Sequence, residues 1–323
     1  MYFEGVISVL TPSKLYMQKT FQELSESWCE TKRSIVKHST MCAYLLTLQT
    51  HLLPHFGRRT SIAENDVQKF VIEKLSCGLA KKTVKDMVAV LKSIVKYGRK
   101  HKLFPFEDWE IEYPTNTETN RLPVLTLKHQ RILMRYLIEK PTSQNIGILL
   151  ALCTGMRIGE VCALQWKNVD FSQRIITVRY TVSRVYNCKL KSTEKIHSSP
   201  KTKKSCREIP ISQQLFQCLK TVKKTSISSY VVGTSEQSKE PRSYRDYFSR
   251  LLKRLGIPPI VFHGLRHTFA TRCIESGCDY KTISAILGHS NVATTLNLYV
   301  HPNYNQKKRC VERMNKYLGI TEL

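Results

Sequence analysis

The stretch EYPTNTETNRLP, residues 112–123, divides the sequence into two parts with different patterns of apolar residues. It contains two prolines and many polar residues and shows no helical or strand periodicity, which is typical of a linker. The chain has 323 residues, enough for a separate hydrophobic core on each side of this stretch. We therefore expect two domains joined by a linker.

Helical patterns dominate the part before this linker. The segments are ELSESWCETKR, HSTMCAYLLTLQTHLLPHFG, ENDVQKFVIEKL and KKTVKDMVAVLKSIVKYGRKH. Apolar residues in the last segment recur at i, i+3, i+4, i+7 and i+11, and they are Val84, Met87, Val88, Leu91 and Val95. In the second segment we expect Ser39 or Thr40 to cap the helix and Gly57 to end it. Four helices of this length predict a small bundle.

The part after the linker is mixed. Helices are expected at LTLKHQRILMRYLIEK, NIGILLALC, SQQLFQCLKTVKK, RSYRDYFSRLLKRLG, LRHTFATRCIES, DYKTISAILG, ATTLNLYV and NQKKRCVERMNKYLGI. RIITVRYTV (174–182) alternates and is β-branched, which predicts a strand. EKIHSS and SCREIPI are expected to be two more strands, joined by a PKTKK turn. This order predicts a mainly α domain with a small antiparallel β-sheet.

The charge of the chain is strongly positive. It has 51 Lys and Arg against 25 Asp and Glu, a net charge of +26. Residues 1–114 carry +5 and residues 115–323 carry +21. Such an excess favours nucleic acid as the partner. An acidic membrane surface is the alternative, but no sustained basic amphipathic helix supports it.

The cysteines and the N-terminus indicate a cytoplasmic protein, and a nucleic-acid partner adds the expectation that it is nucleoid-associated. The 11 cysteines are odd in number, no CxxC occurs, and MYFEGVISVL lacks the positive charge of a signal peptide. We expect reduced thiols that mostly fill core space, no structural zinc and no other cofactor. The longest apolar stretch, residues 146–153, is too short to cross a bilayer.

Four short stretches contain side chains suited to phosphate chemistry. CTGMRIGEVCALQW places Arg157 at a glycine-flanked helix start and Glu160 on the same face, and HGLRH places His263 and Arg266 at i and i+3. PKTKK offers Lys201 at a hairpin tip, with Lys203 and Lys204 beside it, and ILGHSNVATTLNLYVH offers His289 and Tyr299. Taken singly, each stretch has an ordinary structural explanation, such as a surface ion pair, a helix cap or a half-buried tyrosine.

Together these residues fit a reaction at a phosphodiester. Two arginines suit a phosphate whose charge grows in the transition state. A tyrosine with a pKa of about 10 needs a base and a positive field to act as a nucleophile near neutral pH. His263 can accept its proton and Lys201 can donate one to a leaving oxygen. The set lacks the carboxylates of a Mg²⁺ nuclease, and the chain has no ATP-binding phosphate loop, so we expect activity without metal or ATP.

The order TGMRIGE, SPKTKK, HGLRH, LGHS and LYVH resembles the tyrosine recombinases, the phage-type integrases. His263 and His289 are 26 residues apart, as the family prefers. The resemblance covers about residues 20–323 and implies a two-domain clamp on DNA. Its parts are an N-terminal extension (1–19), a helical SAM-like core-binding domain (20–112), a linker (113–123), a catalytic domain (124–302) and a C-terminal helix (303–323).

The resemblance also implies roles for the residues and partners. Arg157 and Arg266 clamp the scissile phosphate, His263 and His289 assist, and Lys201 is the general acid. Glu160 supports them and Tyr299 is the nucleophile that forms a 3′-phosphotyrosyl link. The implied assembly is a homotetramer on two double-stranded DNA sites, for integration, excision or inversion of a mobile element, with an accessory directionality factor as a further partner. The lysines expected to touch DNA are Lys37, Lys81, Lys82, Lys85, Lys203 and Lys204.

Two features depart from the usual pattern. His289 and Tyr299 are ten residues apart, one more than many members show, and Tyr304 is a second candidate nucleophile without the YxH context. Only about 20 residues precede the first expected helix, too few for a separate arm-binding domain, which favours a simpler recombinase. A type IB-like topoisomerase and a catalytically silent DNA-binding regulator of the same fold are the competing interpretations.

Overall fold

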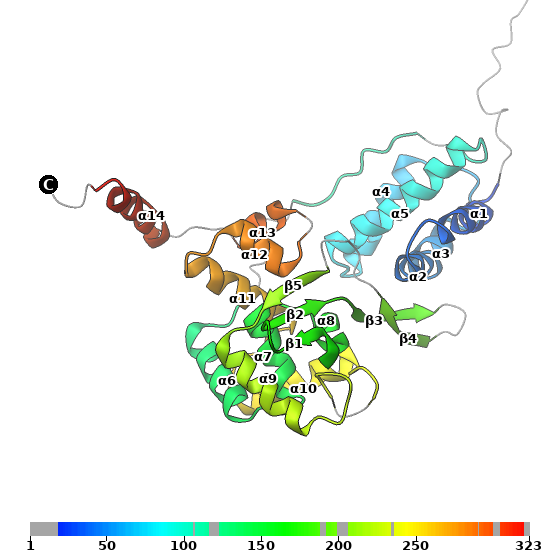
Figure 1. Ribbon diagram of the computed structural model, residues 1–323. Helices are drawn as coiled ribbons and strands as arrows, with labels where there is room; N and C mark the ends of the chain where they lie inside the picture. Colours follow the sequence, from blue (N-terminus) through cyan, green and yellow to red (C-terminus); the bar gives the residue numbers. More distant parts are fainter. Residues whose placement is uncertain are drawn as a thin grey trace, which may run out of the picture. The chain divides into compact units, whose positions relative to one another are not determined.

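The computed structural model describes residues 19–105, 107–115, 123–187, 192–198, 206–233, 236–289, 291–299 and 304–319. The chain divides into two compact units. The first comprises Met1–Glu118 with Val185–Glu194, and the second comprises Thr119–Arg184 with Lys195–Leu323. Helices make up most of the described chain and a few short antiparallel strands accompany them (Figure 1), which confirms the expected fold class.

The first unit consists of helical segments around one core. They are α1 (Phe21–Arg33), α2 (His38–Thr47), the π-helix η2 (Leu48–Leu52), α3 (Leu53–Phe56), α4 (Glu64–Ser76) and α5 (Lys81–Lys100). The five apolar residues predicted for one face of α5 are all buried, as are Trp28 of α1 and Phe70 of α4. The periodicity of α5 therefore identified the core-facing side of this unit correctly.

The second helical stretch differs from its expected start but ends where predicted. Lys37, not Ser39 or Thr40, occupies the N-cap position, and its side chain makes no capping bond there. The helix widens into η2 directly before Pro54, where the Leu53 amide bonds to the Leu48 carbonyl. A proline lacks the amide hydrogen and its ring clashes with the preceding turn, so a wider turn accommodates it without ending the helix. Gly57 is the C-cap.

The second unit contains most of the remaining helices. They are α6 (Leu127–Glu139), α7 (Asn145–Thr154), α8 (Ile158–Ala163), the 3₁₀-helix η3 (Trp166–Asn168), α9 (Gln213–Thr225), α10 (Pro241–Arg254), α11 (His263–Glu275), α12 (Tyr280–Leu287), α13 (Val292–Tyr299) and α14 (Tyr304–Tyr317). Nearly every residue of α7 is buried, so this helix is central to the unit. It packs against α6, α9 and α11, which cover it on different sides because its whole circumference is apolar.

The strands form two small sheets, and this corrects the sequence prediction. The expected strand at 174–182 is two strands, β2 (Ile175–Val178) and β3 (Thr181–Asn187). β2 pairs antiparallel with β1 (Val169–Asp170) and β5 (Arg207–Pro210), whereas β3 pairs with β4 (Ser192–Ser198). The two expected strands EKIHSS and SCREIPI therefore belong to different sheets and do not form a hairpin with each other. The alternating pattern continued through residues 179 and 180, so it could not reveal this change of sheet.

The cysteines fill the core only in part. Among the described residues, Cys29, Cys42, Cys162 and Cys218 are buried, and Cys77, Cys206 and Cys278 are exposed. All nine described cysteines are free thiols. No helix within the described ranges is long and apolar enough to cross a membrane.

Candidate active site

Arg157 lies in the tight connection between α7 and α8. Gly155 ends α7 with a φ of 66°, and a β-carbon there would lie 2.5 Å from Leu287 and 2.7 Å from Phe269. Glycine is therefore required both for the left-handed backbone and for the close approach of neighbouring side chains. Arg157 follows in extended conformation as the N-cap of α8, and its side chain is 37 % exposed. The TG of the TGMRIGE motif thus orients the arginine.

Glu160 holds Arg157 from within the protein. Its carboxylate is 3 % exposed and accepts hydrogen bonds from the Arg157 amide at 2.9 Å and from Arg157 Nη1 at 3.0 Å. It also accepts two bonds from Arg207, so one buried carboxylate lies between two guanidinium groups. Burial alone would raise the pKa of Glu160, but the bonds and charges of Arg207 and Arg157 hold its pKa below the usual value. Glu160 is therefore an anion at neutral pH.

Arg207 is the residue that the sequence analysis missed. It stands at the start of β5, in a strand whose residues alternate between buried and exposed. Arg207 shares the buried face with Ile209, so a charged residue occupies an inward position of a short strand. That alternation was the available signal, because a buried arginine requires a buried acidic partner.

Arg266 is almost completely buried in α11, with 2 % of its surface exposed. Nη1 donates to the Gly155 carbonyl and Nη2 donates to the Leu287 carbonyl, both at 2.8 Å. These carbonyls stand at the C-terminal ends of α7 and α12, where helices leave acceptors unsatisfied. The side chain of Arg266 thereby ties together the segments that carry Arg157 and His289.

His263 begins α11 and faces the same region. Burial lowers the pKa of His263, and the charges of Arg266 and Arg157 lower it further. Its ring contacts the ring of His267 edge-on, with 4.6 Å between centroids. Burial and the neighbouring His263 and Arg266 lower the pKa of His267 to about 4. Both rings are thus neutral at pH 7 and can accept protons.

His289 follows Gly288, whose φ of 66° ends α12 in the left-handed conformation. Nδ1 of His289 is 2.8 Å from Oγ1 of Thr295, a fully buried residue of α13. Burial, followed by the charges of Arg266, Arg157, Arg207 and His263, lowers the pKa of His289 to about 4. The bonds of Arg266 to the carbonyls of Gly155 and Leu287, and the groove shared by Arg157 and His263, bring these two motif arginines and two histidines together.

Tyr299 is the last residue of α13, which packs against α11 and α12. Its backbone belongs to the helix that Thr295 connects to His289, and Thr295 and Tyr299 share a face of that helix at i and i+4. The position of the Tyr299 side chain is outside what the structure describes. Tyr304 opens α14, the next helix.

Lys201, Lys203 and Lys204 lie outside the described residues. The predicted pairing of EKIHSS with SCREIPI is wrong, because these strands pair with β3 and β2 respectively. Lys201 instead belongs to the connection that leads from β4 into β5. The paired strands β2 and β5 are far apart in sequence because this connection and the β3–β4 hairpin lie between them.

A groove of about 450 Å³ opens beside Arg157 and His263. Three further arginines line it, namely Arg184, Arg242 and Arg245, together with Glu240. Nη1 of Arg184 lies 3.9 Å from Oε1 of Glu240, the carboxylate of this lining. The other arginines of the lining therefore give the groove a net positive charge. The groove extends the positive charge of the site along the surface, which suits a polyanionic backbone.

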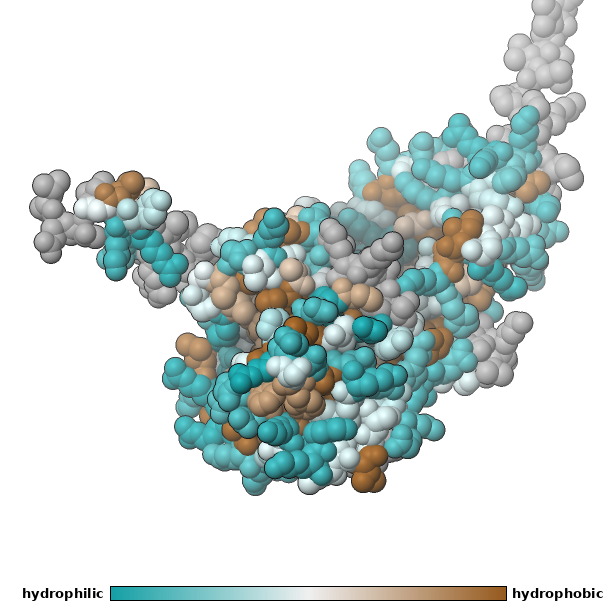
Figure 2. Space-filling model, in the orientation of Figure 1, coloured by the Kyte–Doolittle hydropathy of each residue, from teal (hydrophilic) through white to brown (hydrophobic). Residues whose placement is uncertain are grey.

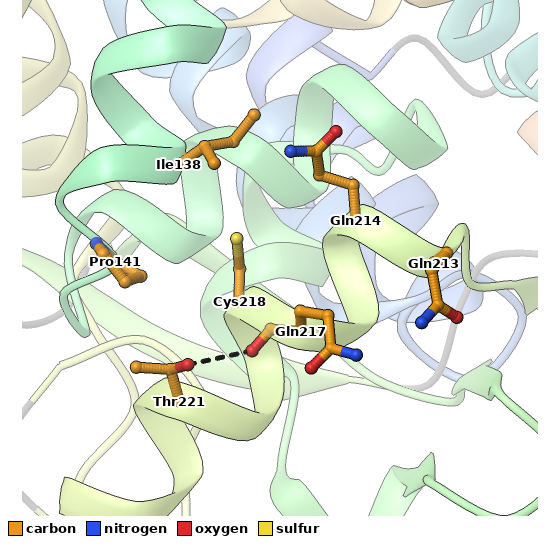
Figure 3. A pocket seen from close by; sticks show the side chains of 7 residues that line it. All are labelled: Ile138, Pro141, Gln213, Gln214, Gln217, Cys218 and Thr221. Carbon is orange, nitrogen blue, oxygen red and sulfur yellow. Dashed lines mark hydrogen bonds between the residues drawn. The ribbon is translucent and has the colours of Figure 1, made fainter.

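A second pocket, of about 460 Å³, contains none of these residues. It lies between the end of α6 and α9, and Gln213, Gln214, Gln217 and Cys218 of α9 line it (Figure 3). Ile138, Pro141 and Thr221 complete its lining. Its neutral side chains offer no group for phosphate chemistry. Within the described parts of the chain, no group of three or more His, Cys, Asp or Glu residues is arranged to hold a metal ion.

In the first unit, three of the lysines expected to touch DNA stand at the start of α5. Lys81 Nζ donates to the Pro114 carbonyl at 2.5 Å, Lys85 lies 4.8 Å from the centre of the Tyr113 ring, and Lys82 pairs with Asp86 at 3.6 Å. No acidic residue occupies this first turn. Lysines at a helix N-terminus add to the positive end of the helix dipole, which is unfavourable unless an anion binds there. Lys37 is likewise at a helix start, as the N-cap of α2.

Comparison with known proteins places this site in a family. The profile described as "Phage integrase family" matches residues 123–306, and "Phage integrase, N-terminal SAM-like domain" matches residues 20–75. The chain is 28 % identical to "Tyrosine recombinase XerC-like" of Caldanaerobacter subterraneus subsp. tengcongensis, over 97 % of this chain and 87 % of that protein. It is 27 % identical to "Transposase from transposon Tn916" of Enterococcus faecalis, over 79 % of this chain and 67 % of the relative.

Solved structures share the fold. An integrase of transposon Tn1549 in complex with transposon right end DNA superposes with a TM-score of 0.76 at 22 % identity, covering 91 % of this chain and 99 % of that chain. A lambda integrase tetramer bound to a Holliday junction superposes with a TM-score of 0.64 at 16 % identity, covering 89 % and 80 %.

Proposed function

Because the chain belongs to the phage integrase family and is a tyrosine recombinase, we propose that it cuts and rejoins double-stranded DNA through a covalent 3′-phosphotyrosyl intermediate. The observation that carries this proposal is that Arg157 and His263 line one positively charged groove, while Arg266 bonds to the Gly155 and Leu287 carbonyls, two residues before Arg157 and before His289. Its chemistry matches the stabilisation of charge on a phosphate in the transition state.

Each side chain has a role that follows from its environment. The Tyr299 oxygen attacks phosphorus, and neutral His263 accepts its proton. Arg157, held by Glu160, and Arg266 stabilise the growing negative charge on the phosphate oxygens. The 5′ oxygen leaves with a proton from Lys201. The phosphate keeps its bond to the 3′ oxygen of the cleaved strand and is now also bonded to the Tyr299 oxygen. Attack by a 5′-hydroxyl reverses these steps and frees the tyrosine.

The assembly that we propose is a homotetramer on two DNA sites. Three apolar residues of α14 and Leu318 directly after it are exposed, including Met314 at 52 % and Tyr317 at 91 %, and Figure 2 shows a brown patch at that helix. Val311 and Leu318 complete this stripe, and Cys310 lies outside the described side chains. A helix with an uncovered apolar stripe suits exchange between protomers. The lambda integrase that shares this fold was solved as a tetramer on a Holliday junction, which supports the same assembly.

The biological setting that fits the relatives is a mobile element. The relatives include transposases of Tn916 and Tn1545 and an integrase of ICEBs1. We place the enzyme on DNA in the cytoplasm, at integration, excision or inversion sites, with a directionality factor as a further partner. The domain boundaries that accompany this proposal are a helical DNA-binding domain at 20–112, a linker at 113–123 and a catalytic domain at 124–302.

Two competing functions are distinguished by the product they give on DNA. A type IB-like topoisomerase would relax supercoiled plasmids regardless of sequence, and a silent regulator would bind DNA without any covalent product. The match to the integrase family over the catalytic half of the chain favours the recombinase over both.

Replacement of the nucleophile tests the proposal. Tyr299→Phe removes the oxygen that forms the bond but little of the binding surface, so it should abolish the SDS-resistant adduct on a nicked suicide substrate and leave DNA affinity within a few fold. The reaction should proceed in EDTA and without ATP, because arginine and lysine supply the charge stabilisation. Tyr304→Phe is the matched control and should form the adduct normally. An adduct that persists in Tyr299→Phe and disappears in Tyr304→Phe would assign the nucleophile to Tyr304.

A further inference from the structure

We infer that Arg207 is a positioning residue for strand cleavage: its guanidinium group holds Glu160, and through it Arg157, against the turn that presents His289. This inference rests on the proposed function, since it assigns a task to a residue outside the motifs that carry the family resemblance. Arg207 donates no proton in this scheme. It acts through the residues that it holds.

The contacts of Arg207 reach two parts of the site at once. Nη2 donates to Glu160 Oε2 at 2.9 Å and Nη1 donates to Glu160 Oε1 at 3.1 Å, a two-pronged arrangement that fixes the plane of the carboxylate. Nε donates to the Ile286 carbonyl at 2.5 Å, in the last turn of α12. One side chain therefore joins the start of α8 to the end of α12.

The bond to the Ile286 carbonyl places the Arg207 side chain next to the turn formed by residues 287–289. A β-carbon on Gly288 would lie 3.0 Å from Cδ of Arg207, so the stem of the arginine packs against the residue that precedes His289. β5, which begins with Arg207, packs against α12. The left-handed Gly288 thus accommodates the arginine as well as ending the helix.

Burial makes this pair a costly choice for stability alone. The side chains of Arg207 and Glu160 are 5 % and 3 % exposed. Replacing a buried ion pair with apolar residues of similar size is often neutral or stabilising, so a buried pair is weak support for a purely structural task. The guanidinium group of Arg157 must bind the phosphate in one orientation, and a fixed Glu160 carboxylate provides that orientation. This requirement explains why the ion pair of Arg207 and Glu160 is buried there.

The chain also brings Arg207 close to the proposed general acid in sequence. Lys201 precedes Arg207 by six residues, in the connection that ends at β5. Anchoring the first residue of β5 to Glu160 fixes the end of that connection relative to Arg157.

The test separates cleavage from binding and folding. Arg207→Met should lower the single-turnover rate of adduct formation at saturating DNA by about 100-fold, the scale of a misplacement of about 1 Å. The dissociation constant for the DNA should change by less than about threefold, since the Arg207 side chain is buried beneath the residues that face the phosphate. Arg207→Lys keeps the charge and should restore part of the rate, but not all, because lysine lacks the planar fork.

A matched control uses another arginine with several partners. Arg272 binds Glu275, Gln130 and the Leu125 carbonyl, away from the motif residues. Arg272→Met should lower thermal stability but leave the rate per folded, DNA-bound molecule as in the wild type. An equal loss of rate in Arg272→Met and Arg207→Met, or an unchanged rate in Arg207→Met, would overturn the inference.

Two further variants keep the test decisive. If Arg207→Met unfolds because Glu160 loses two of its hydrogen bonds, the double variant Arg207→Met with Glu160→Gln is compared with Glu160→Gln alone, and positioning through Glu160 predicts equal rates. The effect of Arg207→Lys should also shrink when Arg157 is already lysine, because both changes disturb one unit. Independent, additive effects would contradict positioning through Arg157. A wild-type chain that forms no adduct at all would instead refute the proposed function.

Discussion

Lys201 differs from its neighbours Lys203 and Lys204 in the task that the mechanism gives it. A proton donor is needed only in the transition state, whereas a lysine that binds a phosphate contributes equally before and during cleavage. Lys201→Ala should therefore slow adduct formation far more than Lys203→Ala or Lys204→Ala does. A substrate with sulfur at the 5′-bridging position should largely restore the rate of Lys201→Ala, because sulfur leaves without a proton. Absence of rescue would remove Lys201 from the acid role.

His267 connects the site to the stability of the fold. Its pKa is about 4 in the folded chain and 6.5 in the reference state, so the unfolded chain binds more protons between these values. The free energy of unfolding should accordingly fall as the pH drops from about 6.5 to 4, and this contribution is fully retained above 6.5. His267→Gln should reduce that slope by up to about 1.4 kcal/mol per pH unit in urea titrations. Identical slopes in wild type and variant would contradict a depressed pKa.

At the level of single residues, sequence reasoning found the motif positions but not the contacts between them. Arg157, His263, Arg266 and His289 were named from their motifs, and the structure gathers them. Arg207 and Thr295 were missed because their roles depend on which segments meet. Glu160 is 47 residues from Arg207 in sequence, and His289 lies in the turn before the helix that carries Thr295.

Among the elements, α14 has a stripe of exposed apolar residues that could bind a neighbouring protomer. The described apolar residues of its stripe are exposed, which disagrees with an α14 folded back onto its own domain. Truncation after Pro302 should leave binding to a single DNA site nearly intact but impair pairing of two sites and recombination. Gel-shift and recombination assays on one-site and two-site DNA measure the two steps separately. Normal recombination by the truncated chain would show that the docking idea is wrong.

Helices were predicted better than strands, and the reason is physical. A helix face repeats over several turns, so the buried face of α5 was readable from local pattern alone. Strand pairing depends on distant segments, and β2 and β5 are separated by a hairpin that local alternation cannot reveal. The cap of α2 was misplaced for a related reason, because serine and threonine near a helix start do not always occupy the N-cap position.

For the whole molecule, the excess of positive charge predicts a steep dependence of DNA binding on salt. Each neutralised phosphate should lower log K by roughly 0.9 per log unit of salt. Residues 115–323 carry +21 and residues 1–114 carry +5, so the catalytic part should account for much of the slope. Filter binding of the full chain and of the separate parts over a salt series measures how much of the slope of log K against log salt concentration each part contributes. Equal affinity at low and high salt would contradict binding through phosphates.

The carboxylate of Glu160 is shared by two guanidinium groups, and so it neutralises only one of them. The resting enzyme consequently keeps an unbalanced cation at its catalytic centre and should take up small inorganic anions from its buffer. An anion at a hundred times its dissociation constant stabilises a folded protein by about 2.7 kcal/mol. Phosphate should therefore raise the melting temperature above that in chloride of equal ionic strength, and should compete with DNA during cleavage. A phosphate buffer should therefore act as a reversible inhibitor of DNA cleavage by this recombinase.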